Sequence, residues 1–175
     1  FFFFYQLRKY NHKNSHCLGS DFLFVDIFSG AMGLTVWQGG VLPYQHDIHV
    51  GTLRLLETFS ANQRASRDYP DALAEYIHAV MRPVWKTIEQ YHPSTLVFSG
   101  RESRIIARLL GWPVIKHNMA ICSREKINSL YDAVGRQSTS HIRQAYGITE
   151  ADADVVLPTI HIYREILEHV PANKV

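Results

Sequence analysis

A short turn after the first apolar segment has the residue types of a phosphate-binding or metal-binding site. Asp26 lies near the end of the apolar run 22–27, and the small residues Ser29, Gly30 and Ala31 follow it. Such a turn can direct backbone N–H groups at a phosphate while the carboxylate binds a metal ion or a water molecule. The alternative is a tight glycine hairpin with an incidental aspartate, because short motifs of this kind often occur by chance.

A second turn of the same type follows the apolar segment 95–98. It consists of Ser99, Gly100, Arg101, Glu102, Ser103 and Arg104, and a helix is predicted from 102 to 110. The N–H groups of this turn add to the positive end of the helix dipole, which favours an anion. Glu102 and Ser103 can equally be ordinary helix-capping residues.

Apolar patterns predict the elements that position these turns. Strands are expected at 22–27, 34–37 and 41–49, with a glycine hairpin turn at 38–40, and a helix at 52–59. The run 22–27 is apolar on both faces, which is typical of a central, buried strand. A polar loop at 61–70 precedes a long helix at 71–91, the strand 95–98, the helix 102–110 and a last edge strand at 114–115.

The rest of the chain reads as three helices, which end near Gly135, Gly147 and Val170. Three consecutive antiparallel strands followed by βα units give the order of a ribonuclease-H-like α/β domain. We therefore expect a mixed sheet of about five strands flanked by helices over residues 21–175, preceded at 1–20 by the end of a helix and a loop.

Composition excludes several classes of protein. The chain has 175 residues with 46% hydrophobic, 12% aromatic and 19% charged residues, which excludes disordered, collagen-like and coiled-coil proteins. A net charge of +2 gives no basic stripe for nucleic acid, and no apolar run approaches the length of a membrane span. The two distant cysteines, Cys17 and Cys122, fit free thiols in a cytoplasmic protein.

Ten histidines raise the separate hypothesis of a metal-binding or structural module. His46 and His49 flank Asp47, but on a strand the two histidines face opposite sides and cannot easily share one ion. His12, His16 and Cys17 lie in a loop, where a zinc site needs further ligands supplied by the fold. Solvated or hydrogen-bonded histidines are the favoured interpretation.

Four segments, taken in order, resemble the second domain of the exopolyphosphatase/guanosine-pentaphosphate phosphatase family. The segment 26–34 is similar to its D-I-G-G-G-S-T-E-L, and 47–55 to its S-L-P-L-G-A-x-R-L. The segment 96–104 is similar to an apolar strand that leads into G-G-T-A, and 152–158 to the end of R-A-D-V-I-L-P. The resemblance covers roughly residues 22–170; each motif is loose, and their order and spacing carry it.

The resemblance implies an actin/Hsp70/acetate-kinase-like fold of two ribonuclease-H-like domains. Polyphosphate or a guanine nucleotide binds in the cleft between them, and Mg2+ assists hydrolysis of a terminal phosphoanhydride. This chain is then the second domain, its partner domain lies upstream of Phe1, and the start without methionine is expected to be a cut. A second copy, in a homodimer, is a further candidate partner.

The resemblance also assigns roles to the residues of the two turns. It makes Asp26 the catalytic residue and Mg2+ ligand, and it makes Arg54 and Arg104 the residues that neutralise phosphate charge. It implies that phosphate is bound by both turns, through Ser29, Gly30, Ala31, Gly100, Arg101, Glu102 and Ser103.

The sequence departs from the family pattern at charged positions. Gly33 stands where the pattern has glutamate, Arg101 where it has glycine, and Asp152 where it has arginine. Glu102, in place of threonine, is expected to repel a polyanion. The first turn also loses two glycines and the hydroxyl residues of G-G-G-S-T-E, and Phe28 and Met32 are expected to crowd it. The lost glycines leave two functional hypotheses open: an active phosphoanhydride hydrolase, and a degenerate member that binds a nucleotide, a phosphorylated ligand or a partner protein without turnover.

Overall fold

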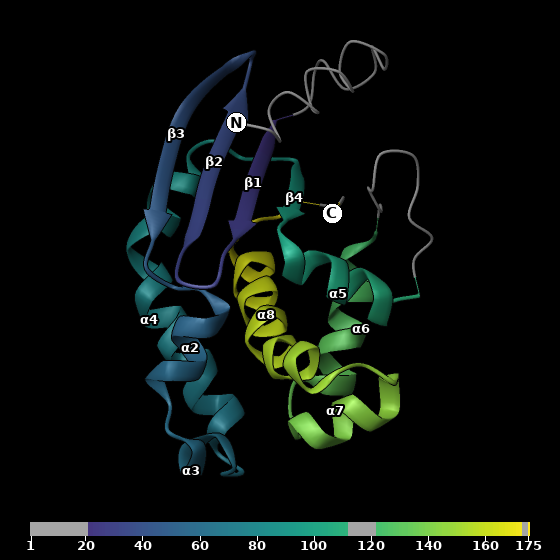
Figure 1. Ribbon diagram of the computed structural model, residues 1–175. Coiled ribbons are helices and arrows are strands. Elements are labelled where there is room, and N and C mark those ends of the chain that lie inside the picture. Colours follow the sequence, from purple (N-terminus) through teal and green to yellow (C-terminus); the bar gives the residue numbers. More distant parts are fainter. Residues whose placement is uncertain (1–20, 112–121, 173–174) are drawn as a thin grey trace.

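A mixed four-stranded sheet forms the centre of the computed structural model, which describes residues 21–111, 122–172 and 175 (Figure 1). The strands are β1 (Phe22–Ile27), β2 (Met32–Gln38), β3 (Val41–Ile48) and β4 (Thr95–Ser99), in the order β3-β2-β1-β4. β1 pairs antiparallel with β2 and parallel with β4. The α/β class and the four strands agree with the prediction; the predicted fifth strand at 114–115 and the predicted segment 1–20 lie outside the described residues.

Seven helices lie within the described residues. They are α2 (Thr52–Thr58), α3 (Ala61–Arg64), α4 (Tyr69–Glu89), α5 (Arg101–Leu109), α6 (Arg124–Val134), α7 (Thr139–Tyr146) and α8 (Glu150–His169). The prediction of a loop at 61–70 is wrong in part. Ser60 and Gln63 form a reciprocal capping box that starts α3, and Pro70 in the first turn of α4 favours a start at Tyr69.

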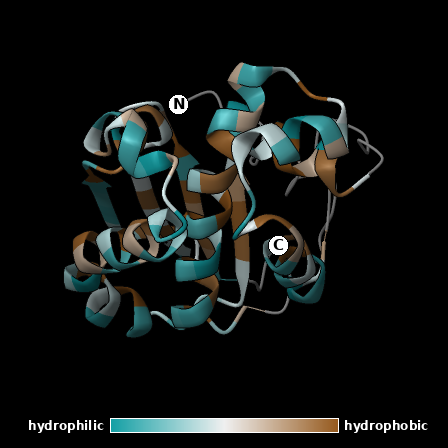
Figure 2. Cartoon of the chain, turned by 90° about the horizontal axis from the view of Figure 1, so that it is seen from below, coloured by the Kyte–Doolittle hydropathy of each residue, from teal (hydrophilic) through white to brown (hydrophobic). Residues whose placement is uncertain are grey.

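Helix α8 is the centre of the helical layer. It contacts α2, α4, α5, α6 and α7, and the residues from Val155 to Tyr163 are all buried. A helix that is apolar around most of its circumference is expected to be enclosed by other elements. Figure 2 shows the hydrophobic positions gathered on the sheet and on the helix sides that face it. None of the described helices is long and apolar enough to cross a membrane.

Helix α8 covers one of the two faces of the sheet, and Asp26 belongs to the other. Phe98 of β4 stacks on Tyr163 of α8 with ring centroids 3.7 Å apart, so α8 covers the face that carries Phe98 and its register neighbour Val25. Side chains alternate along a strand, so the next residues, Asp26 and Ser99, belong to the opposite face. The sheet therefore separates the buried helical core from the side chains of Asp26 and Ser99.

Three backbone segments converge where β1 ends. A Cβ on Gly51, the residue before α2, would lie 2.6 Å from the Ala31 nitrogen and 2.7 Å from the Ser29 oxygen. A Cβ on Gly100, which has φ +106°, would lie 2.5 Å from the Ile27 oxygen. Only glycine allows such approaches, so these two residues bring the α2 start and the β4–α5 turn against the β1–β2 turn.

We predict that Gly51→Ala destabilises the protein, because the new methyl group must displace the backbone of the β1–β2 turn. The expected loss is about 1–3 kcal/mol in the free energy of unfolding, measured by urea denaturation. Gly30→Ala, in the same turn, is the matched control, because a Cβ on Gly30 meets nothing within 4 Å. Its effect should stay within about 0.5 kcal/mol, and equal losses in the two variants would contradict the steric argument.

Candidate functional site

Four residues form one row across the sheet at the end of β1. Asp26 pairs with Gly33 of β2 and with Ser99 of β4, and Gly33 pairs with Asp47 of β3. Residues in register on neighbouring strands point to the same face. The hairpin and the crossover therefore bring Asp26, Asp47 and Ser99 to one edge of the face opposite α8.

The glycine in the middle of this row leaves space for the carboxylate of Asp47. A Cβ on Gly33 would lie 3.2 Å from Asp47 Oδ1 and 3.8 Å from Asp26 Cβ. Position 33 is where the family pattern has glutamate, and position 47 is where it has serine. In this chain the second carboxylate of the row is therefore on β3, opposite the glycine of β2. Asp47 was not among the predicted site residues. A regular hairpin counted from the pair of Gln38 and Val41 would place His46 opposite Gly33, and an irregularity between Val36 and Gln38 shifts the register so that Asp47 takes this place.

The electrostatics of the row suit a hard cation. Asp26 is half-buried, and burial raises the pKa of its carboxyl above the ordinary value of 3.8. Asp47 is exposed, and Ser99 Oγ is buried without a hydrogen-bond partner among the described residues. Carboxylate and hydroxyl oxygens are the ligands that Mg2+ prefers, so the row contains a donor set that fits this ion.

Arg54 of α2 holds the β1–β2 turn by two hydrogen bonds. Its backbone N–H donates to the Ser29 carbonyl over 3.0 Å, and its Nε donates to the Gly30 carbonyl over 2.9 Å. These carbonyl groups therefore face α2. Arg54, predicted to neutralise phosphate charge, has a positioning role in this structure, and its side chain remains exposed.

In the second turn, a protein carboxylate lies at the start of α5. Glu102 is only 6% exposed and accepts a hydrogen bond of 3.0 Å from Thr52 Oγ1 of α2, while Ser103 Oγ donates to the Gly100 carbonyl over 3.0 Å. Acidic side chains are favourable in the first turn of a helix. The negative charge that this helix start attracts is therefore provided by the chain itself.

Arg101, the next predicted phosphate ligand, is paired with α8. Its Nη2 lies 2.5 Å from Asp152 Oδ1, and Arg108 Nη1 lies 3.8 Å from Asp152 Oδ2. Arg101 stands where the family pattern has glycine and Asp152 where it has arginine, so these two departures meet in space. Arg104, on the same helix turn as Arg101, is exposed.

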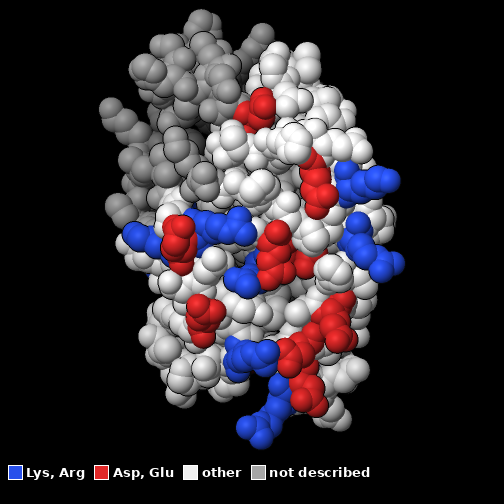
Figure 3. All heavy atoms as spheres, turned by 180° about the vertical axis from the view of Figure 1, so that it is seen from behind, with Lys and Arg blue, Asp and Glu red and all other residues white. Residues whose placement is uncertain are grey.

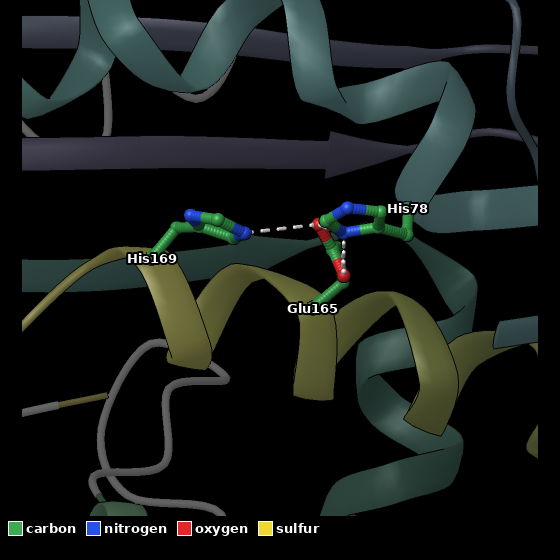
Figure 4. Close-up of side chains that lie close together, drawn as sticks. All are labelled: His78, Glu165 and His169. Atoms are coloured by element: carbon green, nitrogen blue, oxygen red, sulfur yellow. Dashed lines mark hydrogen bonds and ion pairs between the residues drawn. The ribbon is translucent and has the colours of Figure 1, made fainter. Parts of the chain in front are cut away.

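The structure also shows a separate cluster that the sequence analysis missed. His78, Glu165 and His169 each offer a ligand atom, and these atoms lie within 4.8 Å of one another (Figure 4). The spacing of Glu165 and His169, four residues apart in one helix, was a signal for two of the three. The candidates His46 and His49 do not belong to this cluster, and His12, His16 and Cys17 lie outside the described residues.

Charges on the remaining surface are mixed. Figure 3 shows Lys and Arg side chains interspersed with Asp and Glu on the face seen from behind. On that face the described residues form no broad field of one sign, and Arg101 of the second turn is itself paired with Asp152.

Comparisons with known proteins show similarity at the level of structure. No protein-family model matches the sequence, and no curated protein matches it significantly. An exopolyphosphatase from Cytophaga hutchinsonii superposes with a TM-score of 0.73 at 18% identity, covering 89% of this chain and 52% of that one. The Ppx/GppA enzyme of Aquifex aeolicus gives 0.72 at 17% identity, with coverages of 89% and 52%.

An exopolyphosphatase-like protein of known structure gives a TM-score of 0.71 at 19% identity, covering 89% of this chain and 51% of its own. The chain thus spans about half the length of the solved structures that it matches. At these identities the likeness establishes the fold alone. The mixed sheet and its helices have the actin-like α/β fold of the Ppx/GppA exopolyphosphatases.

Proposed function

We propose that this chain is the phosphate-binding half of a phosphoanhydride hydrolase of the exopolyphosphatase type, with a second domain completing the cleft. The observation that carries the proposal is the row of Asp26, Gly33 and Asp47, in which the lost glutamate is replaced by a carboxylate from the adjacent strand. The two candidate substrates, polyphosphate and a guanosine pentaphosphate, both contain the bond to be hydrolysed, a terminal phosphoanhydride. The names of the structural neighbours agree with this class of substrate.

In the proposed mechanism, Asp26 and Asp47 would hold Mg2+, and the ion would supply neutralisation of charge on the phosphate oxygens. Asp26 also orients the attacking water and accepts its proton. Arg54 keeps the β1–β2 turn against α2, and the exposed Arg104 is left to face the phosphate chain. Positioning and charge neutralisation supply most of the catalysis in phosphoryl transfer.

We predict that Asp26→Asn and Asp47→Asn each lower Mg2+-dependent phosphate release from polyphosphate at least 100-fold in the protein with its second domain. The reason is the loss of one of two carboxylates that share the ion. Asp132→Asn, at an exposed position of α6, is the matched control and should keep full activity. Full activity in Asp47→Asn would show that the carboxylate of β3 does not replace the missing glutamate.

A second prediction uses stability instead of activity. Because burial raises the pKa of Asp26 in the folded state, ionisation of this carboxyl costs stability at neutral pH. Asp26→Asn should therefore raise the melting temperature at pH 7. This gain should shrink as the pH falls through the raised pKa, and it should vanish below the ordinary value of 3.8, where both states are protonated.

The response of the melting temperature to Mg2+ distinguishes the loss of a Mg2+ ligand from a general change in stability. The ion should raise the melting temperature of the wild-type protein and of Asp132→Asn, and it should have little effect on Asp26→Asn. An equal rise in melting temperature with Mg2+ in all three proteins would show that the ion binds at a site without Asp26.

A second candidate function, phosphate binding without turnover, is favoured by the β4–α5 turn. Glu102 lies buried at the start of α5, and Arg101 is paired with Asp152. Both contacts reduce the attraction of this turn for a polyanion, so a phosphate chain held at the β1–β2 turn would lack the second contact that positions it for hydrolysis. A protein with intact binding of tripolyphosphate and no phosphate release in the presence of its second domain and Mg2+ would fit this candidate and contradict the hydrolase.

We predict that Glu102→Gln strengthens binding of tripolyphosphate roughly five- to tenfold, because about 1 kcal/mol of charge repulsion is removed while the side-chain shape is kept. Titration calorimetry measures the change. Glu75→Gln, at an exposed position of α4, is the control of equal charge and should have no effect. Unchanged affinity in Glu102→Gln would mean that phosphate does not approach the start of α5.

A further inference from the structure

Two helices that are distant in sequence bring His78, Glu165 and His169 together on the side of the sheet that faces α8. His78 Nδ1 of α4 lies 3.1 Å from Glu165 Oε1 and 3.3 Å from Glu165 Oε2, and His169 Nε2 lies 3.3 Å from Glu165 Oε1 (Figure 4). Glu165 and His169 are one turn apart on α8, so their side chains share a face of the helix. The three side chains converge on one point between α4 and α8.

The carboxylate of Glu165 is buried and held in place by Trp85 of α4. Glu165 is 6% exposed, and Trp85 Nε1 donates a hydrogen bond of 2.8 Å to its Oε1. The Trp85 ring also stacks on His169, with centroids 4.6 Å apart and an interplanar angle of 10°. Trp85 thus fixes two of the three potential ligands, and a buried carboxylate requires a positive partner.

His169 lies between two carboxylates and cannot donate to both when neutral. Its Nε2 faces Glu165 Oε1, and its Nδ1 lies 3.4 Å from Glu89 Oε1. A neutral imidazole has a single N–H, so one of its nitrogens would direct a lone pair at a carboxylate oxygen. A cation bound at Nε2 removes this conflict and leaves Nδ1–H to donate to Glu89. Histidine ligands of metals commonly donate their other ring N–H to a carboxylate in this way.

We propose that His78, Glu165 and His169 bind a divalent transition-metal ion of the zinc class, which cross-links α4 and α8. Two imidazoles and one carboxylate are a preferred ligand set for this class, whereas Mg2+ prefers oxygen ligands. Tetrahedral zinc with bonds of 2.0–2.1 Å separates its ligand atoms by about 3.3 Å, close to the separations from Glu165 in this cluster. The side chain of His78 is 52% exposed, which leaves a fourth position open to water.

This site is distinct from the row of Asp26 and Asp47. Asp152, the residue of α8 that reaches the β4–α5 turn, precedes His169 by seventeen positions, or about 25 Å of helix. The cluster also lies on the face of the sheet covered by α8, opposite the face of Asp26. The proposal therefore does not depend on the proposed hydrolase function.

The test is titration of the EDTA-treated protein with ZnCl2 at pH 7.5 by calorimetry. All proteins carry His12→Ala, His16→Ala and Cys17→Ser, so that zinc bound by these three residues does not contribute. We expect one equivalent of zinc, no competition by millimolar Mg2+, and an affinity at least tenfold lower in His78→Ala and in His169→Ala. His141→Ala, at an exposed position of α7, is the control and should bind zinc unchanged.

Co2+ gives a direct view of the ligands, since a four-coordinate site has strong visible absorption that His78→Ala should lose. His78 is half exposed, so circular dichroism is expected to show that this variant is folded. Absence of stoichiometric zinc binding would overturn the proposal and leave protonated histidines as the partners of Glu165. Equal zinc affinity in His78→Ala and His141→Ala would overturn it as well.

Discussion

The candidate phosphate site depends on the close approach of three backbone segments at the end of β1. Gly51 and Gly100 have no Cβ, so the start of α2 and the β4–α5 turn can contact the backbone of residues 27–31 directly. Arg54 then reaches the carbonyl groups of the β1–β2 turn, and Glu102 reaches Thr52. Because backbone contacts fix this arrangement, the side chains around it can change while the geometry is kept.

Two pairs of side chains lie on this backbone frame. Gly33 and Asp47 lie opposite each other in the row, so the carboxylate of this pair is on β3 and the glycine is on β2. Arg101 and Asp152 form an ion pair between α5 and α8. The first pair leaves a carboxylate on the same face of the sheet as Asp26, whereas the second pairs an arginine at the start of α5 with a carboxylate of the chain itself.

The sequence predicted what depends on local patterns. The apolar run of β1, the glycine turn at 38–40 and the glycine-ended helices follow from residue types within a few positions. The pairs that decide the chemistry join residues far apart in the chain, such as Thr52 with Glu102 and His78 with Glu165, and no local pattern contains them. The capping box of Ser60 and Gln63 was a local signal for α3, and it was overlooked within a polar segment.

Helix α8 connects the two candidate sites and explains why they can serve different purposes. Its first turn carries Asp152, which pairs with Arg101 at the start of α5, and its last turns carry Glu165 and His169 against α4. Since α8 is buried between five other helices, a cation that joins it to α4 stabilises the packing of the whole helical layer. The proposed cation would lie about 25 Å along α8 from Asp152, on the face of the sheet opposite Asp26. Its contribution is therefore to the rigidity of the scaffold, while the chemistry of the proposed hydrolase remains with the carboxylates on the other face of the sheet.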